Sequence, residues 1–190
     1  MRDTRSAMRW WIRNLAVGAA VGLAVGVVVG GTLGRVYMRL VFLAEHDALG
    51  FRTAMGAIVG QFTRGGTTFI YLFAGFAGVL LGVSYAAARP LLPSGTRGRT
   101  IVFVLGATAF MLGQIARSNR EDFTFLPVTR SLVLTAGAVA LTAVFVPVLV
   151  ERVQPDRARR PGRLAQGILT LGMTGFAVFG LTGILIAYAA

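Results

Sequence analysis

The chain contains no cysteine and no lysine, and only 14% of its 190 residues are charged. The missing cysteines exclude disulfides, thiolate metal sites, iron–sulfur clusters and a cysteine nucleophile. The missing lysines exclude a Walker A loop and a Schiff-base lysine. Because a soluble domain carries about 25% charged residues, the composition also excludes a soluble enzyme and a disordered protein.

Five uncharged runs occupy more than half of the chain. They are Asn14–Gly34, Gly65–Ala88, Thr100–Ala116, Ser131–Val150 and Leu164–Ala190. A helix needs roughly 17–25 apolar residues to cross the hydrocarbon core of a bilayer, so each run is long enough. We therefore expect a single all-α transmembrane domain over residues 1–190, an integral membrane bundle of five transmembrane helices. The expected spans are about 14–34, 67–88, 100–116, 131–150 and 164–188.

The first run is not expected to be a cleaved signal peptide. It is 21 residues long, whereas the apolar region of a signal peptide has roughly 7–15 residues. No convincing cleavage site follows it. We therefore expect a first span that is retained.

All nineteen basic residues are Arg, and the formal net charge is +12. Such a charge in a soluble protein suggests nucleic acid, but these Arg residues lie in short segments between hydrophobic runs, so we expect no nucleic-acid partner. Twelve of them flank the spans on the side of the N-terminus and seven on the other side. The positive-inside rule then predicts a multi-pass plasma-membrane protein with a cytoplasmic N-terminus and an extracytoplasmic C-terminus. Trp10 and Trp11 stand where an interfacial anchor is expected.

The segment between the first two runs predicts a short amphipathic helix. Phe51, Met55, Ile58 and Phe62 recur at steps of four, three and four residues, which gives one apolar stripe on a polar helix. This helix either lies in the outer interface or packs on the ends of the spans. Pro147 is expected to kink or end the fourth span, because proline does not continue the hydrogen bonding of a helix.

The most specific pattern is a series of glycines spaced by four in the first span: Gly18, Gly22, Gly26, Gly30 and Gly34. A missing Cβ at every fourth position, as in a glycine zipper, opens a groove that another helix can approach closely. The favoured interpretation is packing against another span of this chain. Self-association and docking of a separate protein remain open. The second span carries a shorter version of the pattern at Ala74, Gly78 and Gly82.

Motifs for catalysis are absent from the sequence. No ionisable residue lies in the middle of a predicted span, which counts against a proton- or ion-coupled pump. Ser84 stands in a near match to a nucleophile elbow, but the only histidine, His46, falls on the opposite side of the membrane. We therefore expect no catalytic residue, no cofactor and no metal ion.

The remaining polar residues gather on the predicted outer side. This outer polar cluster consists of Arg35, Arg39, Glu45, His46, Asp47, Arg117, Arg120, Glu121 and Asp122. One interpretation is a divalent-cation or pH-responsive site, since carboxylates and imidazole bind metal and His titrates near neutral pH. The other is a set of Arg–carboxylate pairs between loops. The second is favoured, because three consecutive helical residues point about 100° apart and do not converge on one ion.

Three strings carry a resemblance to a known family. They are Gly34-Arg35-x-x-Met38-Arg39, Phe62-Thr63-x-Gly65-Gly66-Thr67 and Arg89-x-Leu91-Leu92-Pro93. Over roughly residues 30–95 the chain resembles an uncharacterised actinobacterial family of small multi-pass membrane proteins. The resemblance implies a bacterial membrane location and transfers no catalytic or binding residue.

The sequence favours a non-enzymatic integral membrane protein that acts through helix–helix packing, as an assembly or accessory component. Its expected partners are the lipid bilayer and either a second copy of the chain or another membrane protein. The alternative function is a small transporter or channel component. An integral-membrane enzyme ranks third, because the usual metal, nucleophile and phosphate motifs are missing.

Overall fold

The computed structural model describes residues 4–44, 61–93, 95–118 and 128–154, together with Gly50, Ile58, Gly175, Val178, Thr182 and Leu185. The chain first forms one long helical rod made of α1 (Thr4–Val25), a π-helical turn η1 (Gly26–Gly30) and α2 (Gly31–Ala44). Three further helices follow, α3 (Arg64–Ala88), α4 (Thr96–Ser118) and α5 (Val128–Val153). The described ranges are thus almost wholly helical.

Local chemistry explains both ends of α3. Thr63 adopts an extended conformation and its hydroxyl accepts a hydrogen bond from the Gly66 backbone N–H, which is the usual N-cap arrangement. At the other end, Pro90 has no backbone N–H to donate, and the chain turns through Arg89–Leu92 before α4 begins at Thr96. The chain therefore leaves α3 in a turn directly after residue 88.

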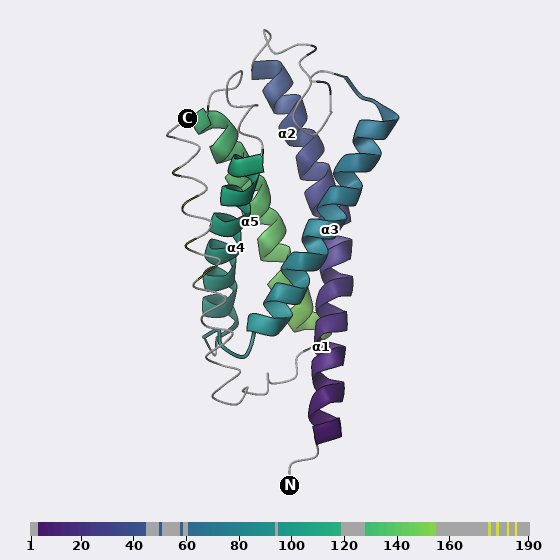
Figure 1. Ribbon diagram of the computed structural model, residues 1–190, viewed down its shortest axis with the longest axis vertical. Helices are drawn as coiled ribbons and strands as arrows, with labels where there is room; N and C mark the ends of the chain where they lie inside the picture. Colours follow the sequence, from purple (N-terminus) through teal and green to yellow (C-terminus); the bar gives the residue numbers. More distant parts are fainter. Residues whose placement is uncertain are drawn as a thin grey trace.

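Four helices pack side by side as a bundle. The rod of α1 and α2 and helix α3 cross obliquely, and α4 lies beside α5 (Figure 1). Successive helices run in opposite directions, so α1 begins, α3 ends, α4 begins and α5 ends at one end of the bundle (Figure 1). We call this the N-terminal end, and we call the other the opposite end.

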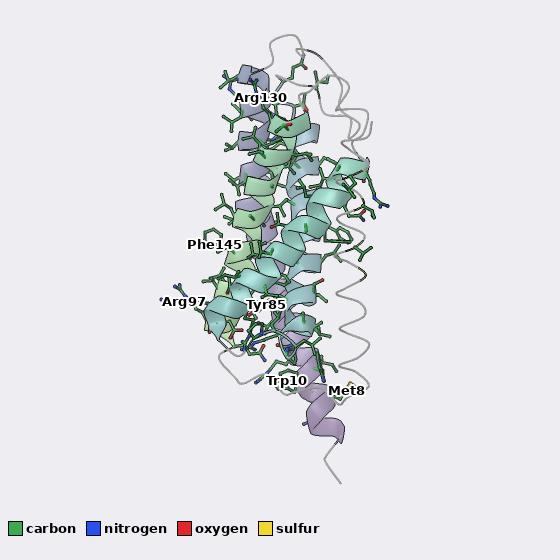
Figure 2. The ribbon with its side chains drawn as sticks, turned by 90° about the vertical axis from the view of Figure 1, so that its left-hand side faces the viewer. Met8, Trp10, Tyr85, Arg97, Arg130 and Phe145 are labelled. Atoms are coloured by element: carbon green, nitrogen blue, oxygen red, sulfur yellow. The ribbon has the colours of Figure 1, made fainter. Side chains whose placement is uncertain are left out.

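The main hydrophobic core lies toward the N-terminal end. It joins Val25, Leu81, Tyr85, Ala88, Leu92, Phe103, Val146 and Val150. Tyr85 is fully buried, and its ring meets the ring of Phe103 edge to face at 5.0 Å between centroids. Phe145, by contrast, points outward from α5 (Figure 2). The bundle therefore has a closed interior and an apolar outer surface.

Four described helices are long and apolar enough to cross a membrane: Met8–Val41, Arg64–Ala88, Thr96–Ser118 and Thr129–Val153. They match the first four predicted spans but extend further at their ends. Most of the fifth span, about residues 164–188, lies outside the described residues. At about 1.5 Å per residue, the 34 residues of the first segment exceed the roughly 30 Å hydrocarbon core, so this helix projects beyond it.

Two other expectations meet the structure only in part. Most of the predicted amphipathic helix lies outside the described residues, and Gln61 and Phe62, which are described, are not helical. Pro147 does not end the fourth span, since α5 continues through it to Val153. Pro147 is fully buried, so neighbouring helices surround the position where the helical hydrogen bond is lost.

Candidate functional site

The closest helix contact is made by the glycines of α1 and α3. Gly18 lies against Gly82, Gly22 against Gly78, and Gly26 against Ala74. A Cβ added at Gly18 or Gly22 of α1, or at Gly26 of η1, would come within 3.0 Å of the main chain of α3. The two backbones therefore touch directly, and the glycine face of α1 is filled by a helix of the same chain.

The π-helical turn changes which residues face α3. In this turn the Gly31 backbone N–H donates to the Gly26 carbonyl, five residues back, so the hydrogen-bonded ring holds one residue more than in an α-helix. Beyond it Gly31 is buried against the ring of Tyr71. Gly30 and Gly34 are only partly buried and approach side chains, Gly30 those of Ala74 and Thr142, Gly34 that of Ile70. All five predicted glycines thus approach α3, the first three at its main chain and the last two at its side chains.

Polar bonds flank the glycine contact at both ends. Toward the N-terminal end, the fully buried Asn14 donates from Nδ2 to the Ala86 carbonyl at 2.7 Å. Toward the opposite end, Arg35 donates from Nη2 to the Thr67 hydroxyl. Position numbers rise along α1 as they fall along α3, so both bonds extend the same antiparallel alignment. They fix its register, since a shift along the helix axis breaks both.

A polar cluster ties three helices together at the N-terminal end. Glu151 of α5 accepts hydrogen bonds from the Tyr85 hydroxyl at 2.6 Å, from Arg89 Nε at 2.9 Å and from Arg99 Nη1 at 2.6 Å. Arg89 Nη2 also donates to the second carboxylate oxygen of Glu151 at 2.8 Å. Paired bonds from one guanidinium to one carboxylate are stronger and more directional than a single bond. We call these four residues the Glu151 cluster.

Arg89 is the most deeply buried charged member of the Glu151 cluster, with 2% of its surface exposed. Its Nη2 atom also donates to the Gln154 backbone carbonyl at 2.8 Å, just beyond the end of α5. A buried cation is costly unless it is paired. The Glu151 carboxylate and the Gln154 carbonyl together offset the cost of burying the Arg89 guanidinium. The guanidinium thus binds the end of α3 to the end of α5.

The chemistry available to the Glu151 cluster is binding between helices. Its carboxylate accepts from three side chains, two of them cations, so it is poorly suited to take a proton from a substrate. Among the described residues no group of three His, Cys, Asp or Glu residues is placed to hold a metal ion. The arrangement closes the N-terminal end of the bundle.

The predicted outer polar cluster is described at only three of its residues, Arg35, Arg39 and Arg117. Arg35 bonds Thr67, and its guanidinium carbon lies 5.2 Å from the centre of the Phe62 ring. Arg117 donates from Nη2 to the Thr182 hydroxyl at 2.5 Å. The remaining residues, Glu45, His46, Asp47, Arg120, Glu121 and Asp122, lie outside the described residues. The metal-site and ion-pair interpretations of this cluster both stay predictions.

Sequence reasoning missed the Glu151 cluster. It treated Arg89 and Arg99 as orientation charges and gave Glu151 no role. A usable signal was present, because the three residues border the ends of the second, third and fourth runs on the same predicted side. An acid and two Arg residues at one membrane depth are natural partners where water is scarce. Tyr85 and Asn14, inside apolar runs, gave no comparable signal.

The helices and their polar contacts indicate a broad class of protein, and they do not identify a family. Four long apolar helices, joined by polar contacts at the two ends, are compatible with a transmembrane protein. Comparison of the chain with family models, curated proteins and solved structures found no match.

Proposed function

We propose that this chain is a non-enzymatic protein of the bacterial plasma membrane that acts as an assembly or accessory component through helix–helix packing. The observation that carries the proposal is the placement of polar side chains. Asn14 and the Glu151 cluster bond helix to helix near one end of the bundle, and Arg35 does so near the other. Between them, backbone contacts of glycine hold α1 to α3. Contacts of this kind hold the helices in fixed positions, so the bundle presents a rigid surface against which another helix can pack.

We further propose five spans, with the N-terminus in the cytoplasm. The bond from Arg117 to Thr182 supports the fifth span, because it joins the last turn of α4 to the final apolar run. Gly175, Val178, Thr182 and Leu185 are all helical. A helix that leaves the N-terminal end near residue 164 and rises about 1.5 Å per residue reaches the opposite end near Thr182. The excess of Arg at the N-terminal end supports the orientation.

A partner, whether a second copy or another protein, then contacts a side of the bundle other than the glycine face. Gly18, Gly22 and Gly26 are covered by α3. On α4 and α5, Gly106 and Gly137 are exposed, and an added Cβ meets nothing within 4 Å at either position. These positions leave room for a neighbouring helix to approach.

The structure offers less support for the transporter alternative than for an assembly or accessory role. A transport path needs polar groups that face a solute. The hydroxyl of Thr142, one of the polar groups inside α5, donates instead to the Ala138 carbonyl of its own helix at 2.8 Å. This bond is the usual behaviour of threonine in an apolar helix.

The proposal is tested by purifying the full chain in a mild detergent and measuring the mass of the particle. We expect a complex of fixed stoichiometry, either with a second copy or with one other membrane protein. A chain that stays monomeric, and whose melting temperature rises on addition of a specific solute, would instead support the transporter alternative.

A further inference from the structure

Three exposed arginines of the N-terminal end, Arg9, Arg97 and Arg152, have no acidic partner among the described residues. Glu151 is the only acidic residue that the described part of the chain contains, and Arg89 and Arg99 both bind it. Arg9 of α1, Arg97 of α4 and Arg152 of α5 are all exposed. Three guanidinium groups from three helices therefore stand at the N-terminal end, and no carboxylate in the described part of the chain neutralises them.

The whole sequence shows the same imbalance. The segments that join the bundle at the N-terminal end, residues 1–13, 89–99 and 151–163, carry twelve Arg and three acids. The segments at the opposite end carry seven Arg and four acids. Three quarters of the net charge of +12 thus belongs to one end of the molecule. A partner for this end must be anionic.

The position of Arg9 on the projecting end of α1 indicates the kind of anion. Asn14 lies beside Ala86, near the end of α3, whereas α1 begins ten residues earlier, at Thr4. At about 1.5 Å per residue, α1 projects roughly 10–15 Å past α3, and the headgroup layer is some 5–8 Å thick. In Figure 2, Met8 and Trp10 lie beyond the level of Tyr85 and Arg97. The projecting turns of α1 therefore cross the layer of lipid headgroups.

The side chains of this projection suit that layer. Trp10 and Trp11 meet edge to face at 5.1 Å, and tryptophan prefers the membrane interface. Met8 and Ile12 are 59% and 60% exposed, so the same turns also offer apolar surface. A lipid supplies acyl chains for this surface and a phosphate for Arg9. A free phosphate or a nucleic acid supplies only the charge.

We propose that Arg9, Arg97 and Arg152 form a binding surface for the headgroups of anionic phospholipids. A planar guanidinium donates paired hydrogen bonds to phosphate oxygens. No described side chain accepts a hydrogen bond from Arg9, Arg97 or Arg152. The Glu151 cluster contributes by removing the only described acid from competition. The surface does not depend on which side of the membrane this end faces, since any leaflet with anionic lipid satisfies it.

The only two tryptophans of the chain, Trp10 and Trp11, make this proposal directly testable. The full chain is placed in nanodiscs of phosphatidylcholine that contain a brominated lipid, which quenches tryptophan on contact. We expect brominated phosphatidylglycerol to quench several-fold more than brominated phosphatidylcholine at equal mole fraction. In the triple variant Arg9→Gln, Arg97→Gln, Arg152→Gln, the two lipids should quench equally.

Three controls separate the possible outcomes. Arg64→Gln changes an exposed arginine at the opposite end and should keep the preference for phosphatidylglycerol. Inorganic phosphate or an RNA oligonucleotide should not abolish it at moderate ionic strength, and abolition by either would overturn the choice of lipid. An undiminished preference in the triple variant would overturn the three residues as the site. If neither brominated lipid quenches, Trp10 and Trp11 do not contact lipid. That result would contradict both the lipid-binding surface and the proposal that the chain is a membrane protein.

Discussion

At the scale of single residues, the contact between the first helical rod and α3 depends on glycines, which carry a hydrogen atom where other residues carry a side chain. Gly78 of α3 lies against both Gly22 of α1 and Gly26 of η1. Lipid is as apolar as leucine, so burying larger side chains gives little drive for two helices to associate, and close packing has to supply it. The stability of the contact therefore rests on how near the two main chains come.

We predict that Gly78→Ala destabilises the bundle by about 1–3 kcal/mol, the usual cost of forcing a methyl group into a closely packed site. The added Cβ meets the Gly22 carbonyl and the Gly26 Cα closer than 3.0 Å, and both are main-chain atoms that do not move aside. The matched control is Gly106→Ala on α4, where a Cβ meets nothing within 4 Å.

Thermal unfolding in detergent should show a lower melting temperature for Gly78→Ala and an unchanged or slightly raised one for Gly106→Ala, since alanine favours helix over glycine. Equal melting temperatures for the two variants would mean that the close approach of α1 and α3 contributes nothing to stability.

The sequence predicted part of this contact. Both halves were visible as small residues spaced by four, Gly18, Gly22 and Gly26 in one run and Ala74, Gly78 and Gly82 in another. The pairing of those halves was not visible, because several spans carry glycines. Gly30 and Gly34 were placed on the same face, and they do approach α3, but at side chains, while Gly31 and Arg35 contact α3 beside them. Nothing in Gly26-Val27-Val28-Val29-Gly30 distinguishes a π-helical turn from an α-helical one.

At the scale of elements, the Glu151 cluster holds the ends of α3, α4 and α5. Its three charged members carry one net positive charge, and the Arg89 side chain is 1% exposed. Removing one partner from a buried ion pair costs more than the pair contributes, because the other charge remains buried. The carboxylate is the critical member, since it is shared by two guanidinium groups.

We predict that Glu151→Gln destabilises the bundle by about 3–5 kcal/mol, because Arg89 is then left buried without a counter-charge. Arg97→Gln is the control, because Arg97 is exposed two residues before Arg99 and should change stability by less than about 0.5 kcal/mol. Unfolding by denaturant in mixed micelles measures both changes.

A double-mutant cycle with Arg99→Gln distinguishes the cluster from a general effect of lost charge. If the Arg99–Glu151 bond of 2.6 Å contributes to stability, the two losses should be clearly non-additive, by about 0.5–3 kcal/mol. If the stability losses of the two single variants add up to that of the double variant, the Arg99–Glu151 bond contributes nothing to stability.

At the scale of the whole molecule, the sequence predicted the four described spans from run length alone, because a bilayer of fixed thickness demands a minimum apolar length. It did not predict how far the helices continue past the hydrocarbon. Thr4–Arg13 and Arg35–Ala44 are helical although charged residues interrupt them, since a helix that is already nucleated extends at low cost. Charged residues at the edges of an apolar run therefore do not mark the ends of its helix.

We predict that phosphatase fusions report opposite sides of the membrane after Gln154 and after Ala190. The end of α5 lies at the N-terminal end, so a phosphatase fused after Gln154 should be inactive in the cytoplasm, and one fused after Ala190 should be active outside. A cytoplasmic reporter at the same two positions should give the reverse pattern. Identical results at both positions would remove the fifth span, and a full exchange would reverse the orientation.

The π-helical turn also has a consequence for how the first span compares among related chains. Its hydrogen-bonded ring from Gly26 to Gly31 encloses one residue that an α-helix does not need. A chain one residue shorter between these two glycines forms an unbroken α-helix, and residues on both sides of the deletion still turn toward α3. A deletion between Asn14 and Gly26 instead rotates the glycines of that stretch away from α3 by about 100°. Length variation within the first span should therefore concentrate at this turn.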